Sequence, residues 1–257
     1  MPIHPTAVVE RGAEIDATAH IGPFAVIGPQ VRIGPATSVG AHAVIEGRTT
    51  LGARNRVFQL AALGAAPQDL KYAGEPTELI IGDDNQIREF TTLHVGTAGG
   101  GGVTRIGSSC LIMATAHVAH DCQIGNGVIL ANGVGLAGHV RIEDHVIFGG
   151  LAAVHQFTRI GRLAFISGGS MVVMDVPPFC TAQGDRAELT GLNNVGLTRA
   201  GVSAEIVSRL KVAYRLLFRS GLTVQQAAEK VRAEVAACPE VTALVDFVTS
   251  SERGVTR

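Results

Sequence analysis

Residues 106–172 read IGSSCLIMATAHVAHDCQIGNGVILANGVGLAGHVRIEDHVIFGGLAAVHQFTRIGRLAFISGGSMV, and this stretch decides the fold. Every sixth residue in it, counted from Ile106, is a large apolar one: Ile106, Ile112, Val118, Ile124, Leu130, Leu136, Ile142, Phe148, Val154, Ile160, Ile166 and Val172. The same step of six holds from Ile3 to Val57 and resumes at Ile81. A repeat of fixed period is the sequence signature of a solenoid.

A period of six matches neither the 3.6-residue period of a helix nor the alternation of a long strand. A short strand followed by a turn accounts for it, with the aliphatic side chain pointing inward each time. Three such units close a triangular coil of 18 residues, and coils stack by strand pairing at about 4.8 Å. The sequence therefore predicts a parallel β-helix of about nine coils, roughly 40 Å long by that spacing.

Two interruptions and a different carboxyl-terminal part complete the organisation. Projecting loops are expected near residues 65–78 and 96–103, where polar residues and a glycine run break the hexads. Pro177 and Pro178 mark the end of the repeat, because proline cannot donate to the strand ladder. The β-helix is thus expected over 1–180 and a C-terminal helical domain over 186–257. Helix starts in that domain are expected from N-cap, capping-box and first-turn signals: Ser203, Thr223 with Gln226, and Pro239.

Composition excludes several classes of function. Hydrophobic residues make up 46% of the chain and aromatic ones only 4%, which suits a narrow core of aliphatic side chains. A net charge of −1 gives no reason to expect a nucleic acid partner. The four cysteines form no CxxC pair, which argues against a zinc knuckle or a disulfide scaffold. No signal peptide is visible, and no apolar run reaches the ~18 residues of a membrane span, so a cytoplasmic protein is expected.

Polar residues gather in the second half of the repeat. Because residues 18 apart occupy equivalent places on adjacent coils, His120 faces Gly138 and Asp121 faces His139. A general base beside an unobstructed backbone N–H is what acyl transfer needs, since the reaction requires proton removal and an oxyanion site. The residues expected to converge across three coils are His117, His120, Asp121, Gly138, His139, His155 and Gln156.

Two other interpretations stay open from the residues alone. Imidazoles that converge on a prism can hold zinc, as in the trimeric hexapeptide carbonic anhydrases. The second interpretation is a purely structural, non-catalytic β-helix, in which the histidines form a row of hydrogen-bonded surface residues. The glycine and glutamine next to the histidines favour a transferase without a bound metal.

Longer motifs resemble one family. QDLKYAGEP at 68–76, AHVAHDC at 116–122, LAGHV at 136–140, AVHQF at 153–157 and DVPP at 175–178 are similar to signatures of the UDP-N-acetylglucosamine acyltransferases of lipid A biosynthesis. The resemblance covers essentially the whole chain. It implies left-handed winding, a cytoplasmic homotrimer with active sites between neighbouring prisms, and no cofactor beyond the phosphopantetheine of acyl carrier protein. The implied reaction moves a (3R)-3-hydroxyacyl group from acyl carrier protein to the 3-hydroxyl of UDP-N-acetylglucosamine.

The resemblance also assigns roles to residues. His120 is implied as the general base, Asp121 as its partner and the Gly138 N–H as the oxyanion donor, without a covalent intermediate. Gly168 matches the position that limits acyl-chain length, and Met171 stands nearby. The residues implied in substrate binding are Asp69, Lys71, His117, His139, His155, Gln156, Asn193 and Arg199.

Two residues of the tail depart from the family's pattern. Ala200 stands where the family often has a second basic residue after the one matched by Arg199, and Val195 stands where some members are acidic. Both departures concern nucleotide contacts of the tail and leave the implied chemistry unchanged.

Overall fold

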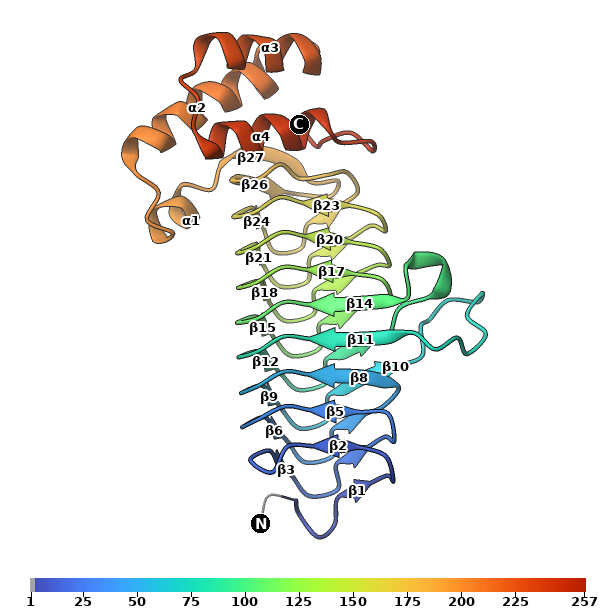
Figure 1. Ribbon diagram of the computed structural model, residues 1–257. Helices are drawn as coiled ribbons and strands as arrows, with labels where there is room; N and C mark the ends of the chain where they lie inside the picture. Colours follow the sequence, from blue (N-terminus) through green and yellow to red (C-terminus); the bar gives the residue numbers. More distant parts are fainter. Residues whose placement is uncertain (1–2) are drawn as a thin grey trace.

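A computed structural model describes residues 3–257 as a triangular parallel β-helix capped by four helices (Figure 1). The expected β-helix of stacked 18-residue coils is confirmed, because Val118 pairs with Leu136 and Leu136 with Val154 in parallel register. The winding is left-handed. Among residues 3–257, no helix is both long and apolar enough to cross a bilayer.

Three sheets form the faces of the prism, and consecutive strands of the chain lie on successive faces. The first face consists of β1 (Val8–Val9), β4 (Val26–Ile27), β7 (Val44–Ile45), β10 (Ala62–Ala65), β13 (Thr92–His94), β16 (His117–Val118), β19 (Gly135–Leu136), β22 (Ala153–Val154) and β25 (Met171–Val172). The second consists of β2 (Glu14–Ile15), β5 (Arg32–Ile33), β8 (Arg48–Leu51), β11 (Glu78–Ile81), β14 (Val103–Ile106), β17 (Gln123–Ile124), β20 (Arg141–Ile142) and β23 (Arg159–Ile160). The third consists of β3 (His20–Ile21), β6 (Ser38–Val39), β9 (Arg56–Val57), β12 (Gln86–Ile87), β15 (Leu111–Ile112), β18 (Ile129–Leu130), β21 (Ile147–Phe148), β24 (Phe165–Ile166), β26 (Cys180–Gln183) and β27 (Glu188–Leu192).

Turns join the faces at three corners, which position the functional residues. The first corner comprises the turns that lead from the first face to the second, such as residues 119–122. The second corner comprises the turns from the second to the third face, such as 125–128, and the third corner those that return to the first face, such as 131–134. Each corner is therefore a column of turns that repeats every coil.

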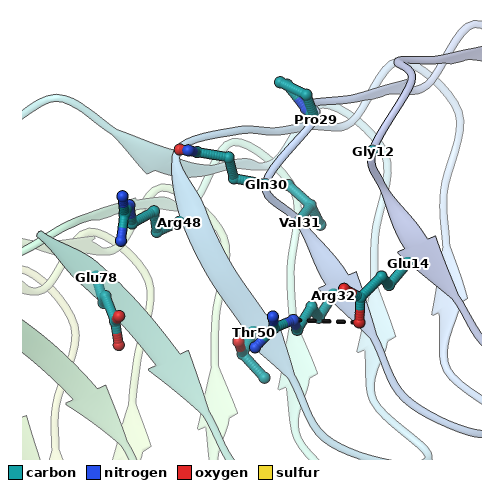
Figure 2. A pocket seen from close by; sticks show the side chains of 9 residues that line it. All are labelled: Gly12, Glu14, Pro29, Gln30, Val31, Arg32, Arg48, Thr50 and Glu78. Atoms are coloured by element: carbon teal, nitrogen blue, oxygen red, sulfur yellow. Dashed lines mark ion pairs between the residues drawn. The ribbon is translucent and has the colours of Figure 1, made fainter. Parts of the chain in front are cut away.

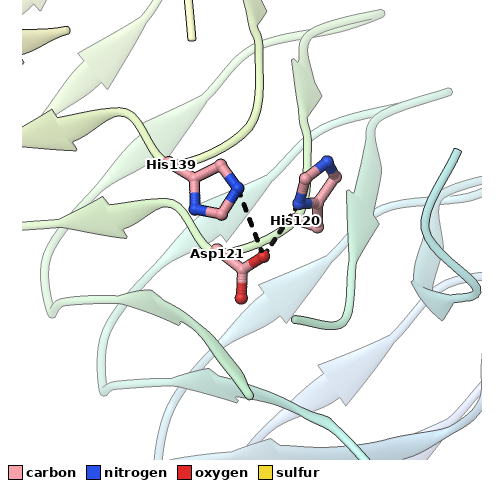
Figure 3. A group of neighbouring side chains, drawn as sticks. All are labelled: His120, Asp121 and His139. Atoms are coloured by element: carbon pink, nitrogen blue, oxygen red, sulfur yellow. Dashed lines mark hydrogen bonds and ion pairs between the residues drawn. The ribbon is translucent and has the colours of Figure 1, made fainter. Parts of the chain in front are cut away.

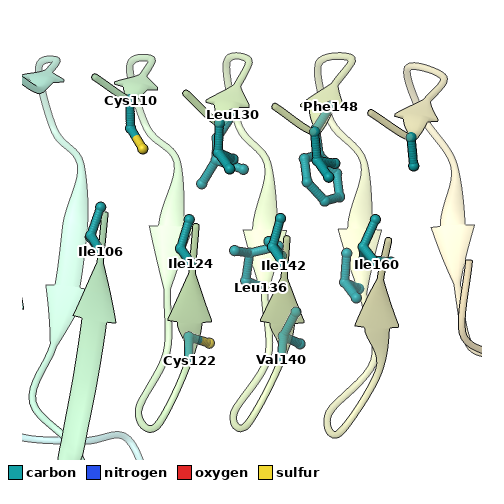
Figure 4. Close-up of a cluster of buried hydrophobic side chains, with 14 of the residues drawn as sticks. Ile106, Cys110, Cys122, Ile124, Leu130, Leu136, Val140, Ile142, Phe148 and Ile160 are labelled. Atoms are coloured by element: carbon teal, nitrogen blue, oxygen red, sulfur yellow. The ribbon is translucent and has the colours of Figure 1, made fainter. Parts of the chain in front are cut away.

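The core is a stack of aliphatic side chains inside the prism (Figure 4). Leu130, Leu136, Ile142 and Phe148 are each at most 3% exposed. The last residue of each turn also points inward, as Val140 does with no exposed surface. That inward position explains why the residue two places before each aliphatic is so often small.

The interruptions fall between strands and leave the stack intact. Residues 66–77 form a loop between β10 and β11, and residues 95–102, which include the short 3-10 helix η1 (Ala98–Gly100), lie between β13 and β14. Figure 1 shows both loops projecting from the same side of the prism. Parallel pairing continues across them, since Leu63 pairs with Leu93.

The expectation of a helical domain from residue 186 needs a correction. β26 extends the third face past the two prolines by pairing with β24, and β27 then pairs with β26 in antiparallel order. β27 is then the outermost strand of this sheet, and α2 packs against it. An uncovered strand edge at the end of a stack would be a template for unwanted pairing. Helices begin only afterwards, with α1 (Asn194–Arg199), α2 (Ala204–Arg219), α3 (Val224–Glu234) and α4 (Pro239–Thr249).

The expected helix starts are confirmed. The Ser203 hydroxyl accepts a hydrogen bond from the backbone of α2, and Thr223 with Gln226 forms a reciprocal capping box on α3. Pro239 is the first residue of α4. Figure 1 shows the helices covering the carboxyl-terminal end of the prism.

Candidate active site

The predicted catalytic residues lie together on the first corner. His120 and Asp121 are the two central residues of one turn, and Gly138 and His139 are the two central residues of the turn one coil further on. Strand register fixes this alignment, because the adjoining residues His117 and Gly135 are direct partners. The predicted spacing of 18 residues is therefore confirmed at this corner.

A histidine–aspartate pair forms the centre of the site (Figure 3). His120 Nδ1 lies 2.8 Å from Asp121 Oδ2, and His139 Nε2 lies 3.9 Å from the same oxygen. The Asp121 side chain has no exposed surface, whereas 15% of the His120 side chain is exposed. An acceptor-only carboxylate at Nδ1 favours the tautomer in which Nδ1 carries the proton, which leaves the lone pair of Nε2 free to accept one.

The loop 95–102 holds the buried carboxylate. Thr97 donates to it twice, from its backbone N–H at 2.9 Å and from its hydroxyl at 2.6 Å. The Asp121 N–H in turn donates to the Thr104 hydroxyl at 2.7 Å. A side chain at Gly100 would overlap the carboxylate, so a glycine there lets the loop close over it. The glycine run that interrupts the hexads thus serves the site directly.

Gly138 keeps the reactive side of His120 open. A Cβ at Gly138 would lie 2.7 Å from His120 Nε2, so any other residue would cover that nitrogen. Its backbone N–H meets no acceptor within residues 3–257. Pro29 occupies the equivalent position in an earlier turn of the same corner, which shows that this amide is not needed by the strand ladder. A base and a free N–H donor therefore stand side by side.

His139 is held by aromatic contacts in the same column of turns. Its ring stacks on Phe157 at 4.3 Å between centroids and meets the His120 ring edge-on at 5.1 Å. Burial lowers the pKa of His139, against the opposing effect of the Asp121 charge. His139 is therefore expected to be neutral at pH 7. Phe157 was not among the predicted site residues.

Two further histidines lie at the edge of the site. His117 Nδ1 bonds the Thr92 hydroxyl at 2.7 Å, and the His94 ring meets His117 edge-on at 5.0 Å. Burial lowers the pKa of His117 and lowers that of His94 to about 4. His94 is 4% exposed, and its Nδ1 has no hydrogen-bond partner within residues 3–257. Sequence reasoning missed His94 because an insertion separates it from the regular 18-residue spacing.

Comparison with known proteins identifies the family. A family model for bacterial transferase hexapeptide repeats matches residues 12–47 and 104–138, and one for domain 2 of UDP N-acetylglucosamine O-acyltransferases matches residues 175–256. The acyl-[acyl-carrier-protein]–UDP-N-acetylglucosamine O-acyltransferase of Myxococcus xanthus is 64% identical over 99% of both chains. The solved UDP-N-acetylglucosamine O-acyltransferase of Moraxella catarrhalis is 44% identical, with a TM-score of 0.97 over 100% of both chains. The Arabidopsis UDP-N-acetylglucosamine acyltransferase is 36% identical, with a TM-score of 0.85 over 99% of this chain and 100% of that one.

This chain belongs to the UDP-N-acetylglucosamine O-acyltransferase family. The resemblance stated from the motifs is thereby confirmed, together with the O-acyltransferase class and the left-handed fold. The site geometry bears on which residues do the chemistry within that family.

The loop residues matching the family motif lie near the histidines. Asp69 is close enough to His139 for its charge to raise the pKa of that histidine, although burial has the larger, opposite effect. Asp69 Oδ1 also accepts the Lys71 backbone N–H at 3.0 Å, which shapes the loop. His155 and Gln156 are exposed on the same corner, one coil beyond Gly138.

Two expected members of the family site lie elsewhere within one chain. Asn193 and Arg199 line a separate cavity of about 1030 Å³ between the second corner and α1. Asn193 caps α1 by accepting the Gly196 N–H at 2.9 Å, and it donates to the Leu163 carbonyl at 2.9 Å. A single chain therefore does not bring these two residues to His120.

The positions expected to limit acyl length also lie off the first corner. Gly168 is in a third-corner turn, where a Cβ would lie 3.2 Å from the Gly150 carbonyl oxygen. Met171 is on the first face, at the end of a column of outward residues that begins at His117 and runs through Gly135 and Ala153. We call this column from His117 to Met171 the lane. Its middle residues, Gly135 and Ala153, are small, and by strand spacing it is about 14 Å long.

A hollow on the second face is a separate feature. It has about 360 Å³ and lies over the early coils (Figure 2). Its most prominent contact is an exposed ion pair, Arg32 Nε to Glu14 Oε2 at 3.2 Å. Exposed pairs of this kind contribute about 0–1 kcal/mol. No histidine or cysteine lines this hollow, so it offers neither an imidazole base nor a thiol nucleophile.

Because burial depresses the pKa of His94, acid should destabilise the fold through this residue. Between pH 6.5 and about 4 the unfolded chain binds a proton that buried His94 does not, so the free energy of unfolding falls as the pH falls. His94→Gln should reduce that loss by about 1–3 kcal/mol. Urea unfolding at fixed protein concentration from pH 7.5 to 4.5 measures it. Exposed His20→Gln is the control, and an equal slope in His94→Gln and wild type would contradict the prediction.

Proposed function

We propose that this protein transfers a (3R)-3-hydroxyacyl group from acyl carrier protein to the 3-hydroxyl of UDP-N-acetylglucosamine, the first step of lipid A biosynthesis. The observation that carries the proposal is the His120–Asp121 pair. His120 Nδ1 contacts Asp121, and His120 Nε2 is open beside the backbone N–H of Gly138. The names of the relatives supply the donor and the acceptor. We propose a cytoplasmic location for this reaction, as the family resemblance implies.

In this proposal His120 is the general base. Its Nε2 removes the proton of the sugar 3-hydroxyl while Nδ1–H donates to Asp121, which stabilises the imidazolium that forms. The sugar oxygen attacks the thioester carbonyl carbon, and the electron pair of the C=O bond moves to its oxygen. The Gly138 N–H donates to that oxyanion. When the carbonyl re-forms, the C–S bond breaks and the departing thiolate takes the proton back from His120.

Direct attack without a covalent intermediate agrees with the residues around the base. Cys122 is adjacent in sequence to the pair, but its side chain is buried and points into the core. Burial raises the pKa of Cys122 to about 12, which keeps the thiol protonated and unreactive. The nucleophile is therefore the acceptor hydroxyl.

Binding of the acceptor is assigned to polar side chains around the base. We assign the Lys71 ammonium to the diphosphate, and Asp69, His117, His139 and Gln156 to the sugar. Being neutral, His117 and His139 can each both donate and accept, as sugar hydroxyls require.

A second copy of the chain completes the proposed site. Asn193 and Arg199 lie at another corner than His120, so a neighbouring prism must supply them if they contact the nucleotide. Large apolar side chains are exposed along the third corner over the length of the prism: Phe24, Leu60, Phe90 and Leu151. A line of this kind is typical of a subunit interface. We propose a homotrimer, the arrangement that the family resemblance implies.

A zinc enzyme is the alternative with one observation in its favour. His120, Asp121 and His139 each offer a ligand atom, and these atoms lie within 4.8 Å of one another. However, Asp121 Oδ2 already accepts hydrogen bonds from Thr97 and from His120 Nδ1. A metal would have to displace the His120 contact, so the hydrogen-bond pattern favours an acid–base pair.

Removal of the base should abolish turnover without loss of binding. General acid–base catalysis typically contributes about 10²–10⁴-fold, so His120→Ala should lower kcat by that factor. Product formation from 3-hydroxyacyl-acyl carrier protein measures it, and calorimetry with UDP-N-acetylglucosamine checks that the sugar nucleotide still binds. His20→Ala, at an exposed site on β3, is the control. More than a tenth of wild-type activity in His120→Ala would remove this residue from the role, and a wild type with neither turnover nor binding would support a structural scaffold.

Chelation should separate the transferase from the zinc enzyme. Because the proposed mechanism uses only an imidazole, a carboxylate and a backbone N–H, exhaustive EDTA treatment should leave the acyl transfer rate unchanged. Elemental analysis of the purified protein should then find no stoichiometric zinc. Loss of activity on chelation, with recovery on addition of zinc, would support the metalloenzyme instead.

Acyl-chain length should depend on residue 168. Each buried methylene contributes about 0.8 kcal/mol, so an open lane favours long 3-hydroxyacyl donors until a side chain blocks it. Gly168 lies in the turn that leads into β25 and Met171, and the Gly150 carbonyl leaves limited room for a Cβ there. We propose that a methionine side chain at 168 narrows the groove that holds the acyl chain. Overpacking typically costs about 1–3 kcal/mol. Gly168→Met should therefore lower kcat/KM for long donors relative to short ones by that free energy. Competition among donors of graded length measures it. An unchanged profile would move the limit to Met171, with Met171→Ala as the next test.

A further inference from the structure

The carboxyl-terminal segment 250–257 returns to the last coils of the prism and brings a cation to His155. Arg253 Nη1 lies 3.3 Å from His155 Nδ1, and the same nitrogen donates to the Val173 carbonyl at 3.0 Å. His155 follows β22 on the first corner, where its backbone N–H bonds the Val172 carbonyl at 2.8 Å. The contact therefore joins the helical tail to the column of turns that carries the catalytic pair.

Hydrogen bonds on both sides hold Arg253 in place. Before it, the Ser251 hydroxyl donates to Asp175 Oδ2 at 2.8 Å. After it, the Asp175 N–H donates to the Gly254 carbonyl at 3.1 Å, and the Thr256 N–H donates to the Asp175 carbonyl at 2.9 Å. Asp175 is only 1% exposed, so the tail is fastened to a buried point of the prism. Arg253 is thus presented to His155 by a fixed backbone.

The contact with Arg253 requires one tautomer of His155. A guanidinium group only donates, so Nδ1 must offer its lone pair and the neutral ring must carry its proton on Nε2. The carbonyl of Gln156 lies 3.1 Å from the same Nδ1 and favours the opposite tautomer, because a carbonyl only accepts. Within residues 3–257, Nε2 has no hydrogen-bond partner of its own. Arg253 therefore decides between two tautomers in which Nε2 has opposite hydrogen-bonding character.

We propose that Arg253 is a positioning residue that holds His155 in the Nε2–H tautomer, so that this exposed ring presents a donor beside the catalytic corner. His155 lies two residues beyond Ala153, which is in the column of outward residues that ends at Met171, so the group that it meets is an acceptor oxygen of the acyl donor. Only this identification of the ligand rests on the proposed function. The tautomer itself is a property of the free protein.

Nitrogen NMR of the ¹⁵N-histidine-labelled full chain tests the tautomer. Long-range ¹H–¹⁵N correlations distinguish the two tautomers, and His155→Gln assigns the signal. The wild type should show Nε2–H, and Arg253→Gln should shift the ring toward Nδ1–H. The variant should also raise the KM for the acyl donor about 3- to 10-fold, the size of one neutral hydrogen bond, with little change in kcat.

Glu252→Gln is the matched control, because this exposed neighbour of Arg253 makes no side-chain hydrogen bond or ion pair within residues 3–257. It should leave the tautomer and the KM unchanged. The proposal is overturned if wild-type His155 carries its proton on Nδ1, if Arg253→Gln leaves the tautomer or the KM unaltered, or if Glu252→Gln reproduces both effects. A protein that transfers no acyl group but shows the Arg253-dependent tautomer would contradict the proposed function alone.

Discussion

The parallel pairing of two-residue strands, repeated every 18 residues, is the constraint on which the rest of this structure depends. Each strand is too short to be stable by itself, and only the stack gives it two hydrogen-bonded neighbours and a buried side chain. A one-residue slip would turn every aliphatic of a coil outward, so the register is strongly specified. Fixed register makes the corners into columns, and a column can hold functional side chains at a constant spacing.

The site uses positions that the stack itself does not need. Asp121, His139 and Phe157 are turn residues with φ between 60° and 64°, a left-handed conformation that aspartate and histidine adopt more readily than most residues do. The amide of the residue before them is free of the ladder, which is why proline is allowed there in early coils and an oxyanion donor is available at Gly138. Chemistry is thus placed at turns while the faces keep the prism rigid.

Insertions and the tail add what a regular repeat cannot supply. The loop 95–102 buries the Asp121 carboxylate and provides the two donors of Thr97 that hold it in place. The loop 66–77 brings Asp69 toward His139. The carboxyl-terminal segment brings Arg253 to His155. Each of these segments interrupts or follows the repeat, and each reaches the same corner.

The sequence by itself determined the β-helix. A period of six residues fits a short strand followed by a turn, and three such units close one coil of a stack. It also determined that His120 lies beside Gly138 and Asp121 beside His139. No insertion falls between these residues, so a separation of 18 residues in the sequence places them at equivalent positions on adjacent coils. Only the tertiary structure decided the rest. His94 and Thr97 reach the site across insertions whose lengths hide their coil positions. Asn193 and Arg199 lie at another corner than His120, and Arg253 contacts His155. Both follow from how the chain beyond the repeat packs against the end of the prism, and no periodicity in the sequence encodes that packing.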